Sequence, residues 1–290
     1  MKKTLTFLLS LVLLVGVALA GCSSNSSAPE ETTTETTETE STEPVKITVG
    51  LNGSGVPIWE YVKEKAAKEG IEIEMVEFAD YVRPNMALAD GDITINAFQT
   101  VSYFNAFIEE HNLDLVPIGT TIIAPMGLYS DKYTSVDEIP DGAKIAVPEE
   151  ATNMGRALLL LQEAGFLKLV DGFDGNGDQS VIVENPKNIE IVPITSAQTP
   201  RVLPDVDASV INNGVAIEAG FIPVEDSIFI EDATATPYIN IIAARAEDKD
   251  DPTLQKLVEI YQQDDVAEHI KEVFKNSLVP VFVPLSELEK

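Results

Sequence analysis

The stretch VKITVGLNGSGVPIWEYVKEKAAKEGIEIEMVEF, residues 45–78, decides the fold class of this chain. Residues 45–51 alternate and are rich in β-branched side chains, which predicts a strand. The glycines of NGSG indicate a turn, and the apolar spacing over residues 57–68, with Gly70 behind it, predicts a helix. Residues 71–78 form a second predicted strand. A strand, a helix and a strand joined so closely indicate an α/β protein built on a parallel sheet.

The same alternation continues downstream. Further helices are predicted over residues 85–89, 101–111 and 153–164, with two more inside 253–274. Further strands are predicted over residues 93–97, 115–130, 144–147, 189–193, 208–212, 227–230 and 238–244. The apolar tail, residues 278–285, is expected to pack against the rest of the protein.

These elements are enough for two α/β lobes, each with its own core. We expect residues 46–130 to form the first lobe, residues 131–237 the second, and residues 238–290 to return to the first. The chain would cross between the lobes near residues 128–131 and again near 238–245. Ligands of such sheets lie beyond the carboxyl ends of the strands, and in a two-lobed protein also between the lobes.

The N-terminus is predicted to be a lipoprotein signal, residues 1–21. Lys2 and Lys3 precede an apolar run that ends in Leu-Ala-Gly-Cys at Cys22, the only cysteine. This is the layout of a secretory signal, and its ending resembles a bacterial lipobox, after which the cysteine carries acyl chains such as palmitate. A transmembrane helix is the alternative, but a run of about 18 residues is at the short limit for a bilayer.

Residues 22–45 follow the signal as a predicted spacer. Residues 23–44 hold six glutamates, no lysine or arginine and no aromatic residue. Such a segment cannot bury enough apolar surface to offset the entropy of ordering it. We therefore expect a disordered acidic linker between the lipidated Cys22 and the folded lobes.

The charge balance excludes one class of partner. The chain has 48 acidic against 19 basic residues and a net charge of −29. It has no basic patch, so nucleic acid is not an expected partner. The acidity is mainly a solubility feature.

No catalytic constellation stands out in the sequence. His111 and His269 lack metal-ligand spacing, no serine lies in a nucleophile-elbow pattern, and there is no P-loop. We expect neither an enzyme nor a cofactor or metal requirement.

One insertion leaves a metal site open as an alternative. In DGFDGNGDQS, residues 171–180, Asp174, Asn176 and Asp178 match the first ligand positions of a calcium loop. Gln179 and Asn185, however, stand where that loop needs glycine and glutamate. A flexible acidic surface turn is the simpler interpretation.

Five stretches resemble one known family. They are FADYVRPNMALADGDITINAFQ (78–99), VPEEATNMGRALLLLQEAGF (147–166), VENPKNIEIV (183–192), DVDASVINNGVAIEAG (205–220) and EDATATPYINIIAAR (231–245). The chain resembles the NlpA-type, methionine-binding lipoproteins, which are substrate-binding proteins of ABC transporters. The resemblance runs in order from about Lys46 to the C-terminus. It implies a two-lobed, periplasmic-binding-protein-like (type II) fold with the ligand in a cleft between the lobes.

The resemblance also implies which residues bind the ligand. Arg156 matches the arginine that pairs with the ligand carboxylate, and Tyr81 matches a tyrosine of the side-chain pocket. The other matching positions are Phe98, Tyr103, Asn153, Asn212 and Asn240.

Taken one at a time, the same residues also have simpler structural interpretations. An arginine can grip a carboxylate with two parallel hydrogen bonds, but Arg156 could instead be a surface residue on a helix. Asn212 could cap a turn beside Asn213 and Gly214, and aromatic residues are most often core. Asn240 is harder to explain as a turn, because isoleucines surround it.

Two positions depart from the family pattern. Thr100 stands where the methionine binders usually have histidine, and Val215 where they usually have tyrosine. Thr100 is predicted to place a small hydroxyl in the pocket instead of an imidazole. This leaves the exact ligand open.

The expected function is that of a monomeric, lipid-anchored receptor outside the cytoplasm, in the periplasm or on a Gram-positive cell surface. It would bind methionine or a related amino acid and deliver it to the permease of an ABC importer. The alternatives are a receptor for another small ligand, such as a short peptide, and an adhesion or signalling lipoprotein that kept the fold but lost the ligand.

Overall fold

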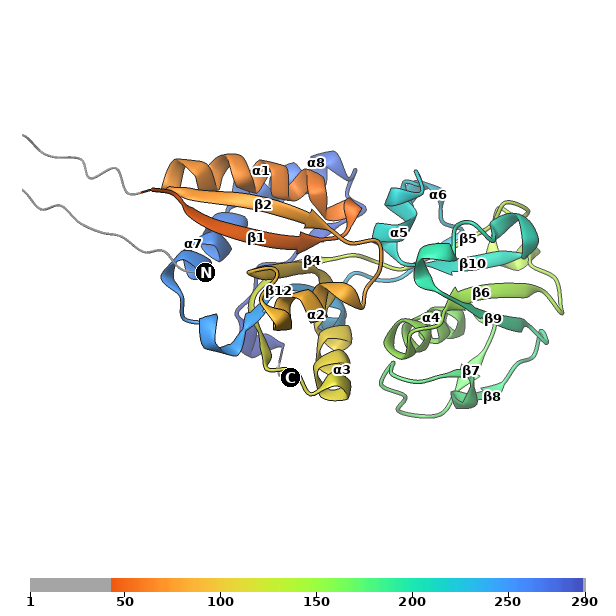
Figure 1. Cartoon of the computed structure of the whole chain (residues 1–290). Coiled ribbons are helices and arrows are strands. Elements are labelled where there is room, and N and C mark those ends of the chain that lie inside the picture. The colour runs from red at the N-terminus through yellow and green to blue at the C-terminus, as the bar shows by residue number, and fades with distance from the viewer. Residues whose placement is uncertain (1–42, 289–290) are drawn as a thin grey trace, which may run out of the picture. The chain divides into compact units, whose positions relative to one another are not determined.

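The computed structural model describes residues 43–288, which fold into two α/β lobes (Figure 1). The predicted signal, Cys22 and nearly all of the predicted spacer lie outside the described residues. Each lobe is built around its own sheet, one of six strands and one of five.

The six-stranded sheet of the first lobe has the order β13-β4-β12-β3-β1-β2. Its strands β2, β1 and β3 are parallel, as the opening stretch predicts. The expectation of a parallel sheet is wrong for the other half, because β12 runs antiparallel to β3 and β4, and β13 antiparallel to β4. The strands are β1 (Val45–Leu51), β2 (Ile71–Glu77), β3 (Ile95–Thr100), β4 (Leu115–Ile123), β12 (Ile239–Arg245) and β13 (Val279–Pro280).

The antiparallel pair of β4 and β12 has a physical cause. The chain leaves the first lobe after β4 and re-enters it through β12, so the two strands run in opposite directions next to each other. The two crossings between the lobes, residues 124–126 and 231–238, are therefore neighbours.

The five-stranded sheet of the second lobe has the order β11-β5-β10-β6-β9. Its centre is parallel, and β5 pairs antiparallel with β10 and β11. The predicted division at residue 130 would place β5 in the first lobe, whereas its hydrogen bonds place it in this sheet. Otherwise the lobe boundaries stay a prediction. The strands are β5 (Gly127–Tyr129), β6 (Lys144–Pro148), β9 (Glu190–Ile194), β10 (Ala208–Ile211) and β11 (Phe229–Ile230).

Eight α-helices lie in the described part of the chain, and a small separate pair of strands, β7 (Lys168–Leu169) and β8 (Ile182–Glu184), follows α4. Helices were predicted at the positions of α1, α2, α3, α4, α7 and α8, and these predictions are confirmed. The helices are α1 (Val56–Ala66), α2 (Arg83–Asp90), α3 (Val101–His111), α4 (Ala151–Glu163), α5 (Asn213–Glu218), α6 (Pro223–Asp226), α7 (Pro252–Tyr261) and α8 (Asp264–Val273).

Helices α1, α7 and α8 cover the six-stranded sheet with one large core. Trp59 on α1 is 1% exposed and packs on Tyr261 of α7, with ring centroids 5.3 Å apart. Burying such aromatic surface is a large part of what stabilises a lobe. In the second lobe, α4 contributes most of its length to the core.

The C-terminal segment packs as predicted. Leu278 is buried, β13 pairs with β4, and the N–H of Val283 donates to the Oγ1 of Thr120 at 3.0 Å. Over residues 43–288, none of the helices combines the length and the apolar character that spanning a bilayer would require.

Candidate functional site

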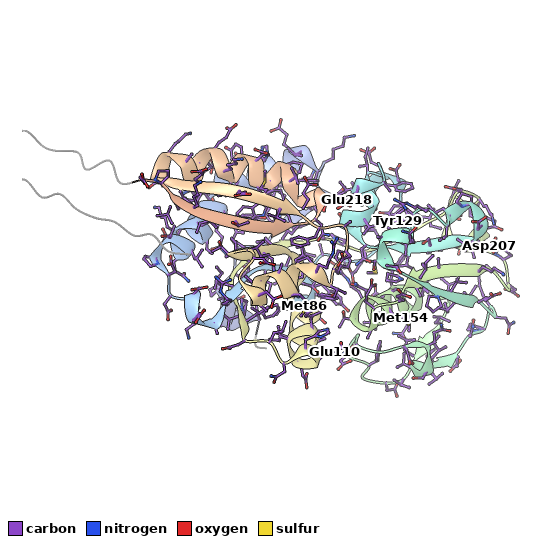
Figure 2. The ribbon with its side chains drawn as sticks, in the orientation of Figure 1. Met86, Glu110, Tyr129, Met154, Asp207 and Glu218 are labelled. Carbon is purple, nitrogen blue, oxygen red and sulfur yellow. The ribbon has the colours of Figure 1, made fainter. Side chains whose placement is uncertain are left out.

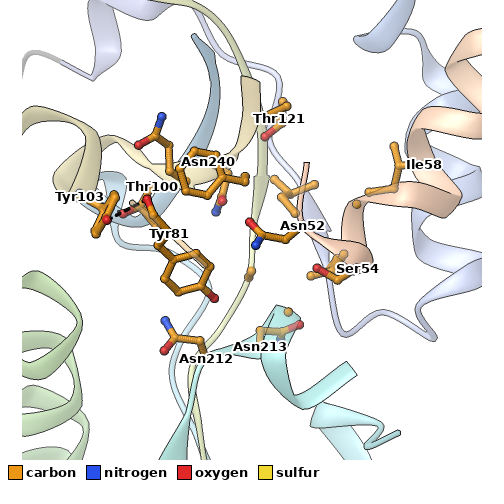
Figure 3. A pocket seen from close by; sticks show the side chains of 18 of the residues that line it. Asn52, Ser54, Ile58, Tyr81, Thr100, Tyr103, Thr121, Asn212, Asn213 and Asn240 are labelled. Atoms are coloured by element: carbon orange, nitrogen blue, oxygen red, sulfur yellow. Dashed lines mark hydrogen bonds between the residues drawn. The ribbon is translucent and has the colours of Figure 1, made fainter. Parts of the chain in front are cut away.

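A cavity of about 100 Å³ lies between the two lobes and is lined by residues of both (Figure 3). The structure brings all eight positions predicted from the sequence to its walls: Tyr81, Phe98, Thr100, Tyr103, Asn153, Arg156, Asn212 and Asn240.

Topology explains why residues so far apart in sequence meet here. Tyr81 lies in the segment after β2, Thr100 ends β3, and Asn212 follows β10. Parallel strands present their carboxyl ends at one edge of the sheet. Asn240 is the second residue of β12, which runs antiparallel to β3. The first residues of β12 therefore reach the same edge, where Asn240 pairs with Thr100.

Three aromatic side chains form one wall of the cavity. The ring of Tyr81 lies 6.0 Å from that of Phe98 and 6.1 Å from that of Tyr103. The Tyr103 hydroxyl donates to the backbone carbonyl of Tyr81 at 2.9 Å, which ties the loop to α3. Burial raises the pKa of both tyrosines well above the usual value, so both phenols stay neutral. The wall is apolar with hydroxyl groups at its edge.

A buried amide cluster behind this wall holds its loop in place. Asn85 on α2 and Asn96 on β3 have no exposed surface, and Gln99 is 3% exposed. Asn85 Nδ2 donates to Gln99 Oε1 at 2.8 Å, and Gln99 Nε2 donates back to Asn85 Oδ1 at 2.7 Å. Asn96 Nδ2 donates to the same Asn85 oxygen at 2.9 Å. Because these buried amides satisfy one another, they join the start of α2, just after Tyr81, firmly to the sheet.

Thr100 has a local role that the sequence analysis missed. It is the N-cap of α3, and its Oγ1 accepts the N–H of Tyr103 at 3.2 Å (dashed in Figure 3). The hydroxyl lines the cavity as predicted, but its acceptor capacity is partly used by the helix.

Arg156 is the only charged residue among the described residues that line the cavity. The alternative of a surface arginine is wrong, because its side chain is 5% exposed. Its guanidinium stacks over the ring of Tyr238, 4.1 Å from the centroid. Burial raises the pKa of this tyrosine to about 12, although the neighbouring Arg156 charge acts in the opposite direction.

The two parallel hydrogen bonds expected from Arg156 to a ligand carboxylate cannot form at one edge of the guanidinium, because Glu231 already occupies that edge. Nε donates to both carboxylate oxygens of Glu231, at 2.9 and 3.1 Å, and Nη2 pairs with the same carboxylate. Nη2 also donates to the Ala124 carbonyl at 3.0 Å. Within residues 43–288 no acceptor bonds Nη1, and Arg156 lines the cavity, so Nη1 is the nitrogen that remains for a ligand carboxylate.

Asn153 and Asn212 belong to a chain of polar side chains that leads out of the cavity. Asn212 Nδ2 donates to Asn153 Oδ1 at 3.1 Å, Ser196 Oγ is 3.3 Å from Asn212 Oδ1, and Ser196 Oγ donates to Glu150 Oε2 at 2.6 Å. Asn212 stands at the start of α5, but its side chain makes no capping bond. The turn-cap alternative therefore does not hold.

Asn240 is 9% exposed, and the bond that it makes is weak, from Nδ2 to the Tyr238 carbonyl at 3.5 Å. A buried amide with little protein bonding is suited to a polar ligand.

Two further asparagines line the cavity and were read as turn residues in the sequence. Asn213 Nδ2 donates to the carbonyls of Pro125 and Ser277, both at 2.9 Å, and Asn52 Nδ2 donates to that of Phe78 at 2.9 Å. The amide oxygen of each is buried without a partner among the described residues. Only their place just beyond the carboxyl ends of β1 and β10 could have pointed to them.

The lobes also touch beside these residues. Glu218 on α5, labelled in Figure 2, accepts the N–H of Ser54 from the first lobe at 3.0 Å. An adjoining cavity of about 400 Å³ shares Tyr81 and Asn52 with the first and is bordered by Glu149, Glu150 and Glu218.

The insertion after α4 lies at the surface, as its composition indicated, with most of its residues exposed, but it is anchored to the protein at Gly175 and Gly177. Gly175 is buried against Gly155 of α4 and against Tyr238, and the N–H of Gly177 donates to the Ala151 carbonyl at 3.2 Å. Asp174 and Asp178 accept backbone N–H groups of their own turns. In residues 43–288, no group of three histidine, cysteine or acidic side chains is arranged for a metal ion.

The family model described as NlpA lipoprotein matches residues 47–282. Among curated proteins, the chain is 40% identical to the D-methionine-binding lipoprotein MetQ of Salmonella typhi, over 96% of this chain and 98% of that protein. It is 36% identical to the uncharacterized lipoprotein YhcJ of Bacillus subtilis, over 99% and 97%. A nutrient-binding protein from Burkholderia cenocepacia, solved bound to methionine, superposes with a TM-score of 0.79 at 43% identity, over 82% of this chain and all of that one.

Proposed function

Since this chain belongs to the NlpA lipoprotein family, we propose that it is the substrate-binding protein of an ABC importer. It binds methionine or a related amino acid between its lobes and delivers it to the permease subunits in the membrane. We propose that Cys22 carries the lipid anchor on the extracytoplasmic face and that the receptor acts as a monomer without catalysing a reaction.

The observation that carries this proposal is the single cavity at which the predicted residues meet. A free amino acid needs a cation for its carboxylate, oxygen acceptors for its ammonium and an apolar surface for its side chain. Arg156, through Nη1, would bind the carboxylate. The amides of Asn153, Asn212 and Asn240 offer oxygen acceptors for the ammonium. The aromatic wall of Tyr81, Phe98 and Tyr103 offers the apolar surface for the side chain.

The two-lobed architecture supplies the mechanism. The walls come from both lobes, so a ligand contacts both only when they are closed. Ligand binding then shifts the population toward the closed form, because only that form makes all the contacts.

A short peptide is the second candidate ligand. The adjoining cavity of about 400 Å³ shares Tyr81 with the first and would accommodate a ligand that extends beyond a single amino acid. An adhesin that lost its ligand is less well supported, since it would have no need for a buried guanidinium whose Nη1 has no acceptor among residues 43–288.

The test is a thermal-shift screen of the full chain in detergent against the L-amino acids, D-methionine and methionine-containing dipeptides. A ligand at a hundredfold excess over its dissociation constant stabilises the folded protein by about 2.7 kcal/mol. We expect a clear rise in melting temperature with methionine or a close analogue. A larger rise with a dipeptide would select the second candidate, and no rise with any compound would refute amino-acid reception.

A further inference from the structure

Glu231 is a buried acidic residue beside the ligand cavity that the sequence analysis did not single out. It follows β11 in the second crossing between the lobes, and its side chain is 10% exposed. Its Oε2 accepts the N–H of Met126 in the first crossing at 3.1 Å, and its own N–H donates to the Met126 carbonyl at 3.0 Å. Glu231 therefore joins the two crossings to each other.

The same carboxylate determines the orientation of Arg156. Glu231 takes the Nε and Nη2 edge, the Ala124 carbonyl takes the remaining hydrogen of Nη2, and the Tyr238 ring covers one face of the guanidinium. Each of these contacts comes from a crossing segment. A side chain with many rotamers is thereby held in one, with Nη1 left for the cavity.

The pair also sets the charge of the site. Arg156 is the one charged residue among the described cavity-lining residues, and Glu231 balances it from the far edge of the guanidinium. A plain carboxylate bound at Nη1 would add a negative charge beside a guanidinium whose charge Glu231 already balances. A zwitterionic amino acid brings its own ammonium and adds no net charge, so burying it costs less.

We propose that Glu231 is a positioning and selectivity residue for ligand recognition: it orients Arg156 and makes the site select zwitterionic amino acids over simple carboxylic acids. This inference rests on the proposed function, because it concerns the recognition of the same ligand.

The experiment compares two probes that differ only in the ammonium group, L-methionine and 4-(methylthio)butanoate. Calorimetric titration of the full chain in detergent measures the affinity for each. The variant Glu231→Gln keeps the shape and removes the charge, whereas Glu231→Asp keeps the charge on a shorter side chain. The control Glu225→Gln changes an exposed acidic residue that lies 3.8 Å from Lys275 and away from the cavity.

We expect the wild-type protein to prefer methionine and Glu231→Gln to reduce that preference roughly tenfold or more, because the repulsion of an anionic ligand is removed. Glu231→Asp should keep the preference even if both affinities fall, and Glu225→Gln should change neither. If Glu231→Gln is too unstable for calorimetry, the thermal shifts produced by the two probes give the same comparison.

A merely structural role predicts that Glu231→Gln weakens both probes by the same factor, and that result would overturn the inference. So would a wild-type protein without a preference for methionine over the butanoate. A wild-type protein that binds no amino acid in the thermal-shift screen would instead refute the proposed function itself.

Discussion

Replacing Gly155 by alanine tests how closely the insertion of residues 171–180 is packed onto α4. A Cβ at this position would lie 2.2 Å from the carbonyl oxygen of Gly175 and 2.5 Å from its carbon, far inside contact distance. The obstacle is backbone, held by the bond from Gly177 to Ala151 and by a φ of +87° at Gly175. The loop therefore cannot give way as a side chain would.

Two effects of opposite sign compete in this variant. Exchanging glycine for alanine inside a helix normally stabilises it by about 1 kcal/mol. Overpacking a filled contact costs about 1–3 kcal/mol. Because the clash is with backbone, we expect the upper end of the overpacking cost, about 3 kcal/mol, so that Gly155→Ala loses about 2 kcal/mol of unfolding free energy after the gain in helix propensity.

Urea unfolding followed by circular dichroism measures this loss. The matched control for stability is Gly214→Ala on α5. There the new carbon would come too close only to the Oγ of Ser54, at 2.7 Å, which can rotate away, and the Ser54 Cβ at 3.5 Å is at ordinary contact distance. If Gly155→Ala proves as stable as the wild type or more stable, helix propensity outweighs the clash and the packing argument is refuted. Because Gly175 also contacts Tyr238, beneath Arg156, methionine affinity should fall in the same variant.

Three other perturbations have definite expected outcomes. Arg156→Ala should abolish methionine binding in calorimetry and destabilise the protein by about 3–5 kcal/mol in urea, because it leaves Glu231 buried and unpaired; unchanged affinity would remove Arg156 from the site. Asn85→Leu should cost about 1–3 kcal/mol, because it orphans the amides that it bonds, and a wild-type urea midpoint would contradict the role of the cluster. The Lys144 N–H lowers the pKa of Asp207, whose carboxylate it bonds at 2.8 Å. The stability that the Asp207 carboxylate contributes is fully present above the ordinary carboxyl pKa and is lost as the pH falls through the lowered pKa of the folded protein. Asp207→Asn should therefore weaken the acid dependence of the melting temperature. A pH profile identical to that of the wild type would exclude this linkage.

Sequence patterns were sufficient for most elements because those patterns are local. The strand, helix and strand of residues 45–78 appear as β1, α1 and β2, since alternation and helical spacing report which face of a segment is buried. The long apolar segment at residues 115–130 was harder. It divides at Pro125 into β4 of one sheet and β5 of the other, and no local signal states which sheet a strand joins.

The pairing of Arg156 depended on contacts that no spacing rule describes. Arg156 and Glu231 are 75 residues apart and meet because α4 packs against the crossings between the lobes. The composition of residues 171–180 indicated a surface loop, which they form, but it could not show that Gly175 fits a gap on α4 that exists only because position 155 lacks a side chain.

The amino-acid sequence by itself determined most of the elements and the α/β class, because burial periodicity can be read locally. The residues expected at the cavity were identified by their match to the family's sequence motifs, and periodicity alone would not have selected them. Only the tertiary structure decided that β12 and β4 run antiparallel, and that Glu231 and the Ala124 carbonyl take the Nε and Nη2 hydrogens of Arg156. Pairings of this kind depend on where separate segments come to lie after folding, and on which buried polar groups must then satisfy one another.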